Sequence, residues 1–403
     1  MTAAQDALLE AVDASQPAAL DFARDLVAIP TENPPGNAYK QCAEAIARKL
    51  KNMGLEPEIV EAPTAGSDAP GSCVVAFHGE GERVLYFHGH YDVVPRSREG
   101  QFEPVIEGAK LFGRGSSDMK GGLAAMVGAV EAVRRLGTRL NGRIGLVCVA
   151  DEETGGARGS SWLARNGLLG KNAIGMLTPE PTSGSVWNAN RGAISLRVTV
   201  KGKSAHVGLS CQGVNAFEGM LAMANEFAKL KTEIAGRETA YRVEPAEARR
   251  SILLLGGECR GGSNFNLVPD TCSFTLDRRI NPEEDFAEEK RRLFEVLEKL
   301  GRVGIEHDVE ILQEGIASAS SEEHPLARTL SWAIESVTGS RPRFEMCPGL
   351  LETRFYAGRG IPAFAYGPGL LEVSHGCDEF VPLANISNCA AIYALVAHRV
   401  LAE

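Results

Sequence analysis

The octapeptide RIGLVCVA, residues 143–150, is apolar at nearly every position. A strand with one face in water alternates apolar and polar side chains, whereas a strand covered by helices on both faces is apolar throughout. The octapeptide therefore predicts an inner strand of a mostly parallel sheet. It is preceded by helical patterns at residues 39–53 and 123–136 and by short apolar strands at 74–78 and 84–90. Alternating helices and strands of this kind are typical of an α/β fold.

The pattern changes near Arg191. Residues 194–200 and 271–279 alternate apolar and polar side chains, which indicates antiparallel strands with one face in water. The remaining elements that we expect are helices at 216–230 and 283–300, then a helix at 325–337, a strand at 363–366 and a helix at 386–400. The sequence thus predicts a three-layer α/β domain built from residues 1–190 and 314–403. It is interrupted at 191–313 by a smaller α+β domain with an antiparallel sheet.

The composition narrows the class of protein. The 403 residues carry a net charge of −10 (42 basic and 52 acidic side chains), and the basic residues are scattered, which argues against nucleic-acid binding. No apolar run approaches the ~18 residues that span a bilayer, and no signal-peptide pattern is evident. The nine cysteines include no CxxC pair, as is typical of reduced thiols. We therefore expect a cytoplasmic protein that binds neither nucleic acid nor membrane.

Two motifs carry candidate metal ligands. HGHYDVVP, residues 88–95, contains His90 and Asp92, which share one face of an extended segment. A metal-binding imidazole usually donates its second N–H to a carboxylate, so Asp92 would orient His90; the alternative is a buried histidine bonded to a neighbouring acid. In GRGSSDMKGG, residues 113–122, a glycine-rich turn presents Asp118 before a predicted helix. Asp118 is either a carboxylate that bridges two cations or only a turn or capping residue.

Three further motifs follow along the chain. DEETGG, residues 151–156, comes directly after the RIGLVCVA strand. On an extended backbone Glu152 and Glu153 would point in opposite directions, so that one is a ligand and the other a general base; an acidic surface turn is the alternative. Glu180 lies between two prolines that stiffen its loop. His375, in VSHGCDEFVP at 373–382, is a candidate ligand from the far end of the chain.

In this order, the motifs resemble those of the metallopeptidases that include acetylornithine deacetylase, succinyl-diaminopimelate desuccinylase, aminoacylase and carboxypeptidase G. The resemblance runs over nearly the whole chain, from LVAIPT (26–31) and NPPG (33–36) to DEF (378–380). It implies two divalent metal ions per subunit, expected to be zinc with cobalt or manganese as alternatives. The implied reaction is hydrolysis of the amide bond of an N-acyl amino acid or a small peptide.

The resemblance also implies a role for each acidic and imidazole residue. Asp118 would bridge the two metal ions, His90 and Glu180 would complete one site, Glu153 and His375 would complete the other, Asp92 would orient His90, and Glu152 would be the general base. A glutamate at the position of Glu180 is more common among deacylases and carboxypeptidases of the family than among aminopeptidase-like members.

Within the resemblance, residues 1–190 and 314–403 form the catalytic domain, and 191–313 form a lid and dimerisation domain. His206 would stabilise the oxyanion in the partner subunit of a homodimer, and Asn266 and Arg279 would face the substrate. An arginine such as Arg279 grips a carboxylate in bidentate fashion. Arg354 stands where many relatives carry a Thr-Asp or Ser-Asp pair, near the substrate pocket.

Other activities fit the same motifs. An aminohydrolase or a dipeptidase acting on another small C–N bond would use the same metal site. A non-catalytic metal-binding relative would be expected to lack the base or a ligand, and here every position is filled.

Overall fold

A computed structural model describes residues 2–63 and 70–402. The chain forms two compact units. The first comprises Met1–Asn188, Ala319–Glu345 and Glu352–Glu403, and the second comprises Ala189–Ser318 and Met346–Leu351.

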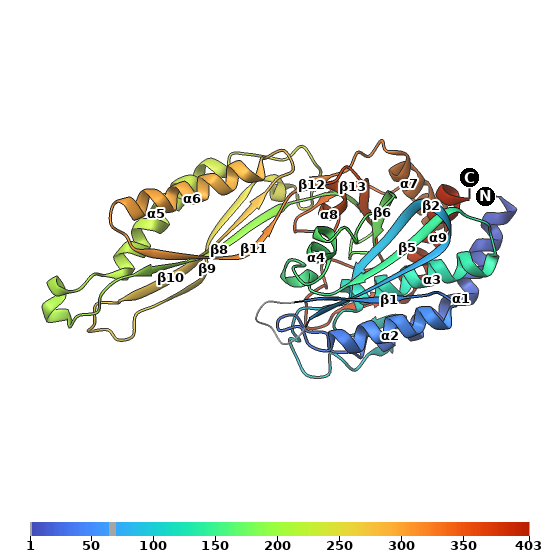
Figure 1. Ribbon diagram of the computed structural model, residues 1–403, viewed down its shortest axis with the longest axis horizontal. Coiled ribbons are helices and arrows are strands. Elements are labelled where there is room, and N and C mark those ends of the chain that lie inside the picture. The colour runs from blue at the N-terminus through green and yellow to red at the C-terminus, as the bar shows by residue number, and fades with distance from the viewer. Residues whose placement is uncertain (1, 64–69, 403) are drawn as a thin grey trace. The chain divides into compact units, whose positions relative to one another are not determined.

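The first unit is built on a mixed sheet (Figure 1). Among the described residues this sheet has eight strands: β1 (Glu58–Ala62), β2 (Gly71–His90), β5 (Asn141–Val149), β6 (Ala173–Thr178), β7 (Val186–Asn190), β12 (Ser318–Ala319), β13 (Phe344–Cys347) and β14 (Ala363–Ala365). The second half of β2 runs parallel to β5, with Val84 opposite Arg143 and His90 opposite Val149. β6 runs parallel to β2 on one side and to β14 on the other. The predicted α/β class is thus confirmed.

Both faces of this sheet are covered by helices. One face packs on α2 (Tyr39–Asn52), α3 (Gly121–Leu136), α7 (Pro325–Thr338) and α9 (Leu383–Leu401), with α1 (Ala3–Val27) packed against α3 and α9. The other face packs on α4 (Ser160–Arg165) and α8 (Arg354–Ala357). Successive side chains of β5 point to opposite faces of the sheet, and each face has its own hydrophobic core. Leu146 packs in the core of the first face, and Val147 and Val149 pack in the core of the second. This division explains why RIGLVCVA is apolar throughout.

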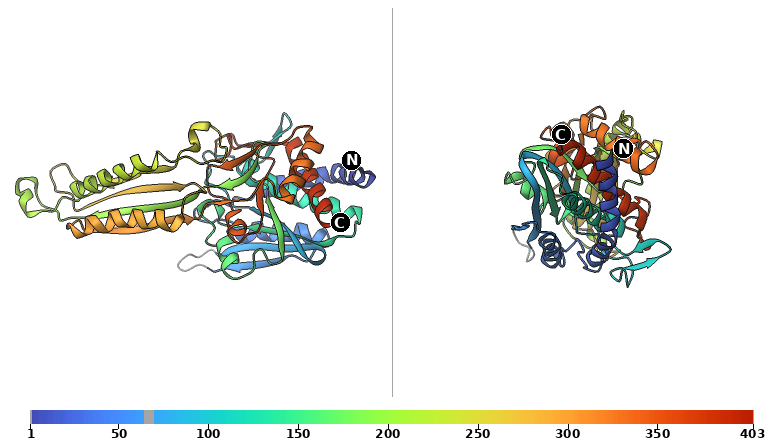
Figure 2. Two further views of the ribbon diagram at one scale, coloured as in Figure 1. Left: turned by 90° about the horizontal axis from the view of Figure 1, so that it is seen from above. Right: turned by 90° about the vertical axis from the view of Figure 1, so that its right-hand side faces the viewer.

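The second unit is a four-stranded antiparallel sheet with two helices. The strands are β8 (Gly192–Lys201), β9 (Ile252–Gly261), β10 (Thr271–Ile280) and β11 (His307–Gly315), in the order β11-β8-β10-β9, and the helices are α5 (Ala216–Ile234) and α6 (Phe286–Arg302). Figures 1 and 2 show both helices along one face of the sheet. Apolar side chains of β8 and β10, such as Leu196 and Phe274, point to these helices, while Arg197 lies on the opposite face. The predicted alternation is confirmed.

Several elements were not predicted from the sequence. They include α1, β1, β9 and β11, and a small sheet formed by β3 (Val105–Glu107), β4 (Lys110–Phe112) and β15 (Phe380–Pro382). The strands predicted at 74–78 and 84–90 are the two halves of β2. Within the described ranges, the structure holds no helix that is both long and apolar enough to cross a membrane.

We expect the core around β2 to dominate the stability of the first unit. Phe87 is fully buried and packs edge-to-face on Tyr393, with the ring centroids 4.8 Å apart. Replacing it by alanine leaves a cavity, so Phe87→Ala should lower the free energy of unfolding by about 3–5 kcal/mol. Urea unfolding followed by circular dichroism measures this loss. Phe265, which is 97% exposed, provides the control. An equal loss in Phe265→Ala would contradict the expectation.

Candidate metal centre

The carboxyl ends of three adjacent parallel strands bring the candidate residues together. His90 is the last residue of β2 and lies opposite Val149, the last residue of β5. Phe87 of β2 lies opposite Leu177 of β6, so Glu180, three residues beyond Leu177, is level with His90. Open α/β sheets bind ligands at this edge. The register of the sheet therefore sets the positions of the side chains that follow each strand.

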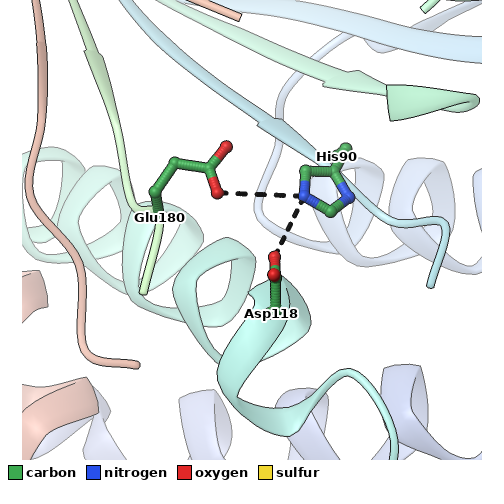
Figure 3. A group of neighbouring side chains, drawn as sticks. All are labelled: His90, Asp118 and Glu180. Atoms are coloured by element: carbon green, nitrogen blue, oxygen red, sulfur yellow. Dashed lines mark ion pairs between the residues drawn. The ribbon is translucent and has the colours of Figure 1, made fainter. Parts of the chain in front are cut away.

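His90, Asp118 and Glu180 form a first cluster (Figure 3). His90 Nε2 lies 3.2 Å from Asp118 Oδ1 and 4.0 Å from Glu180 Oε2. The loop of Glu180 lies against the start of α3, where a side chain on Gly122 would come within 2.4 Å of the Pro179 carbonyl oxygen. A glycine at this position lets the helix and the loop approach closely enough for Asp118 and Glu180 to face the same imidazole.

Asp118, Glu153 and His375 form a second cluster. His375 Nε2 lies 3.2 Å from Asp118 Oδ2 and 3.4 Å from Glu153 Oε2. Asp118 thus offers one carboxylate oxygen to each cluster. This is the arrangement of a carboxylate that bridges two cations.

Asp92 organises the turn that carries Glu152 and Glu153. Its carboxylate accepts the backbone N–H groups of Glu152 at 3.0 Å and Glu153 at 3.1 Å. His90 Nδ1 lies 3.0 Å from the backbone carbonyl oxygen of Asp92 and 3.5 Å from its carboxylate. Asp92 therefore holds the imidazole mainly through its backbone and holds the acidic turn through its side chain.

The prediction of an extended backbone at residues 151–153 was wrong. Asp151 has a φ of 71°, and residues Glu152–Thr154 form a single helical turn that ends at Gly155, with a φ of 100°. The bonds to Asp92 favour this turn, because an extended chain would direct successive N–H groups to opposite sides. Asn33 completes the arrangement by donating to Asp92 Oδ2 at 2.8 Å and to Thr154 Oγ1 at 2.9 Å. Asn33 was not among the predicted site residues, although it lies in the NPPG motif that carries the family resemblance.

The electrostatics of the two clusters favour bound cations. Burial raises the pKa of Glu180 to about 8 and also raises the pKa of Glu153. Among the residues that the structure describes, the buried oxygens Glu153 Oε1 and Glu180 Oε1 have no hydrogen-bond partner. Carboxylate and imidazole ligands suit zinc, manganese and cobalt. The donor set therefore fits two divalent metal ions that share Asp118.

Glu152 lies beside the clusters without belonging to either. Removal from water raises the pKa of its carboxyl group well above the usual value; His90 opposes this shift, and Glu180 and Glu352 add to it. A carboxylate with a raised pKa, close to a cation site, is suited to accept a proton near neutral pH.

Four other predicted residues belong to neither cluster. His206 and Asn266 are neighbours in the second unit, where the Asn266 carbonyl oxygen accepts the N–H of Val207 at 2.9 Å. Arg279, at the end of β10, donates to Asp277 Oδ2 at 2.8 Å. Arg354 is buried in the first unit and donates to the carbonyl oxygen of Gly155 at 3.0 Å, so it supports the acidic turn. Contact of these four residues with a substrate stays a prediction.

Comparison with known proteins shows the family. The model of peptidase family M20/M25/M40 matches residues 86–399, and the chain belongs to this family. It is 29% identical to the succinyl-diaminopimelate desuccinylase of Gluconacetobacter diazotrophicus over 405 residues, which cover 96% of this chain and 98% of that protein.

Solved structures share the fold. The dipeptidase Dug1p of Saccharomyces cerevisiae is 14% identical with a TM-score of 0.79, and the alignment covers 99% of both chains. A metallo-carboxypeptidase of the M20 family from Sulfolobus solfataricus is 16% identical with a TM-score of 0.77, and the alignment covers 94% of this chain and 98% of that one. Together with the family match and the two ligand clusters, the fold identifies the chain as a metal-dependent hydrolase of amide bonds.

Metal binding should release protons. Glu180 below its pKa of about 8, and the imidazole of His375 below its pKa of about 10, hold protons that a cation must displace, so zinc affinity should fall as the pH falls through this range. Calorimetric titration of the metal-free protein with zinc, in two buffers of different ionisation enthalpy, counts the protons released. The variant Glu180→Gln should release fewer. Equal proton release from both proteins would show that Glu180 carries no displaceable proton.

Proposed function

We propose that the chain hydrolyses the amide bond of an N-acyl amino acid or a small peptide, with the two ligand clusters as a dinuclear metal site. The observation that carries the proposal is Asp118, whose two carboxylate oxygens each face a different imidazole at 3.2 Å. His90 and Glu180 would hold one ion, and Glu153 and His375 the other. Zinc fits this ligand set, with cobalt or manganese as alternatives.

The bound ions would lower the pKa of a water molecule and polarise the carbonyl group of the substrate. Glu152 then takes the proton of the attacking water. As the tetrahedral species collapses and the C–N bond breaks, Glu152 hands the same proton to the leaving amine. The raised pKa of Glu152 supports both transfers, because a stronger base accepts the proton and its conjugate acid can still release it.

Asp92 and residues of the second unit would complete the machinery. The Asp92 carboxylate keeps Glu152 in place by accepting the backbone N–H of Glu152 at 3.0 Å. We propose that His206 donates to the developing oxyanion in the partner subunit, and that Asn266 and Arg279 bind polar groups of the substrate. The Arg279 guanidinium already pairs with the carboxylate of Asp277, and a substrate carboxylate could take a similar position. Arg354 would also bind the substrate.

The acyl group separates the candidate substrates. The relative from Gluconacetobacter is named for removing a succinyl group, while the structural neighbour Dug1p is named as a dipeptidase. Release of free amine from N-succinyl amino acids, N-acetyl amino acids and dipeptides, with zinc or cobalt added, would decide between a deacylase and a dipeptidase. A protein that binds two ions per chain but hydrolyses none of these substrates would instead be an aminohydrolase of another C–N bond.

Substitutions of Glu152 and Glu153, which are neighbours in the sequence, should affect catalysis and metal binding separately. Glu152→Gln removes the base and keeps the side-chain shape, so kcat should fall by ~10²–10⁴-fold while two ions remain bound. Glu153→Gln, the matched control, should instead lose the second ion. Metal analysis beside steady-state kinetics distinguishes the two. Loss of an ion from Glu152→Gln would recast Glu152 as a ligand.

We propose that the second unit joins two copies of the chain into a homodimer. On α5, Phe217 and Leu221 are half exposed, and Leu254 is half exposed on β9, which lies at the edge of its sheet. An apolar helix face and an edge strand are both surfaces that a second chain can cover.

The dimer can be tested by one charge substitution. Leu221→Glu should produce a monomer in light scattering, because a charge would be buried at the interface. Turnover should fall with it, since His206 would no longer reach a partner. Val303→Glu, at a residue that is exposed beyond α6, should remain a dimer. A monomeric wild-type protein would overturn this assignment.

We also propose a cytoplasmic location. Cys211, Cys259 and Cys377 are exposed free thiols. Exposed free thiols persist in a reducing compartment.

A further inference from the structure

His375 differs from the other candidate metal ligands in its exposure. Its side chain is 51% exposed, whereas those of Asp118, Glu153, Glu180 and His90 are between 13% and 2% exposed. Its backbone has a φ of 63°, a left-handed conformation that is costly for a residue with a β-carbon. An exposed side chain on a strained backbone needs other contacts to keep its imidazole at 3.2 Å from Asp118.

Arg114 supplies such a contact. Its side chain is 1% exposed, and its Nη2 group donates to the carbonyl oxygen of His375 at 3.3 Å and to Ser97 Oγ at 3.0 Å. Its Nη1 group donates to Glu379 Oε2 at 2.7 Å. Glu379 is also 1% exposed, so the two charges form a buried ion pair. The guanidinium thus binds the His375 loop at two points, the backbone of the ligand and a residue four positions beyond it.

Glu379 binds the other loop of the second cluster. Its Oε1 atom accepts the backbone N–H groups of Gly115 at 3.0 Å, Ser117 at 3.0 Å and Asp118 at 3.1 Å. One carboxylate therefore holds the turn that presents Asp118, while its second oxygen holds Arg114. The backbone adds a further link, because Gly113 N–H donates to the carbonyl oxygen of Glu379 at 3.0 Å.

We propose that Arg114 and Glu379 are a positioning pair that fixes His375 relative to Asp118 and so determines the metal affinity of the second site. Neither residue contacts the reacting atoms. Arg114 acts on His375, whereas Glu379 acts on Asp118, which both sites share. The two residues should therefore have different effects: loss of the Arg114 contacts weakens the second site, and loss of the Glu379 charge weakens both.

This inference rests on the proposed dinuclear site, and its test separates the two. Metal-free protein is titrated with Co²⁺ and followed by calorimetry and visible absorption, which report the affinity and the ligand set of each ion. In Arg114→Lys the first ion should bind as in the wild type, and the second ~10–100-fold more weakly, as is usual when a residue that supports a ligand is changed. In Glu379→Gln both ions should bind more weakly.

Arg278→Lys provides the matched control. Arg278 is a fully buried arginine whose Nη2 lies 2.7 Å from Glu289 Oε2 in the second unit, which carries none of the candidate ligands, so the same substitution perturbs a buried ion pair of another unit. It should lower the thermal midpoint and leave both Co²⁺ affinities unchanged.

Two results would overturn the inference. One is an Arg114→Lys protein that binds both ions with wild-type affinity and spectrum. The other is equal loss of both ions from Arg114→Lys together with a fall in thermal midpoint, which would make the pair a general element of stability. A wild-type protein that binds fewer than two ions would instead overturn the dinuclear proposal itself, and with it this inference.

Discussion

The structure depends on four largely buried carboxyl groups, those of Asp118, Glu152, Glu153 and Glu180, placed around the imidazoles of His90 and His375. Like charges at this separation cannot all be ionised unless positive charge lies among them: burial raises the pKa values of Glu152, Glu153 and Glu180, whereas the two imidazoles lower the pKa of Asp118. The protein supplies part of that charge through His90 and His375, which each face two of the acids. Divalent cations would supply the rest. The arrangement is costly without them, so metal binding and the stability of the first unit are expected to be linked.

The sheet positions some residues of this site, and the loops position the others. Strand register fixes His90 and Glu180 at the same level, and buried strands are among the most rigid parts of a fold. Asp118, Glu152, Glu153 and His375 stand on turns. Carboxylates that accept backbone N–H groups hold the turns of the three acids, and the Arg114 guanidinium donates to the carbonyl oxygen of His375. Asp92 holds the turn of Glu152 and Glu153, and Glu379 holds the turn of Asp118. A carboxylate that accepts several N–H groups orders a turn strongly, since charge-assisted hydrogen bonds are stronger than neutral ones.

The sequence allowed the fold class and the candidate ligands to be predicted, but not the contacts that hold them. RIGLVCVA indicated a strand buried on both faces, because both its even and its odd positions are apolar. In the structure Leu146 and Val147 pack in the cores on opposite faces of the sheet. The turn at Asp151 was mispredicted, since its left-handed conformation is set by bonds to Asp92, about 60 residues away along the chain. The ion pair of Arg114 and Glu379 joins residues 265 positions apart. No local pattern marks such a pair, because either residue alone is compatible with a solvated surface.

The position of β14 has a consequence for how the chain is made. This strand lies between β6 and β7 in the sheet, yet it is encoded after the whole of Ala189–Ser318. As the polypeptide leaves the ribosome, β6 and β7 emerge with a gap between them that only residues 363–365 can fill. Most of the second unit can therefore fold during translation, while the first must wait for its last segment. His375 and Glu379 follow in that segment, so the second cluster lacks a ligand and the turn of Asp118 lacks its support until the end of the chain has been made.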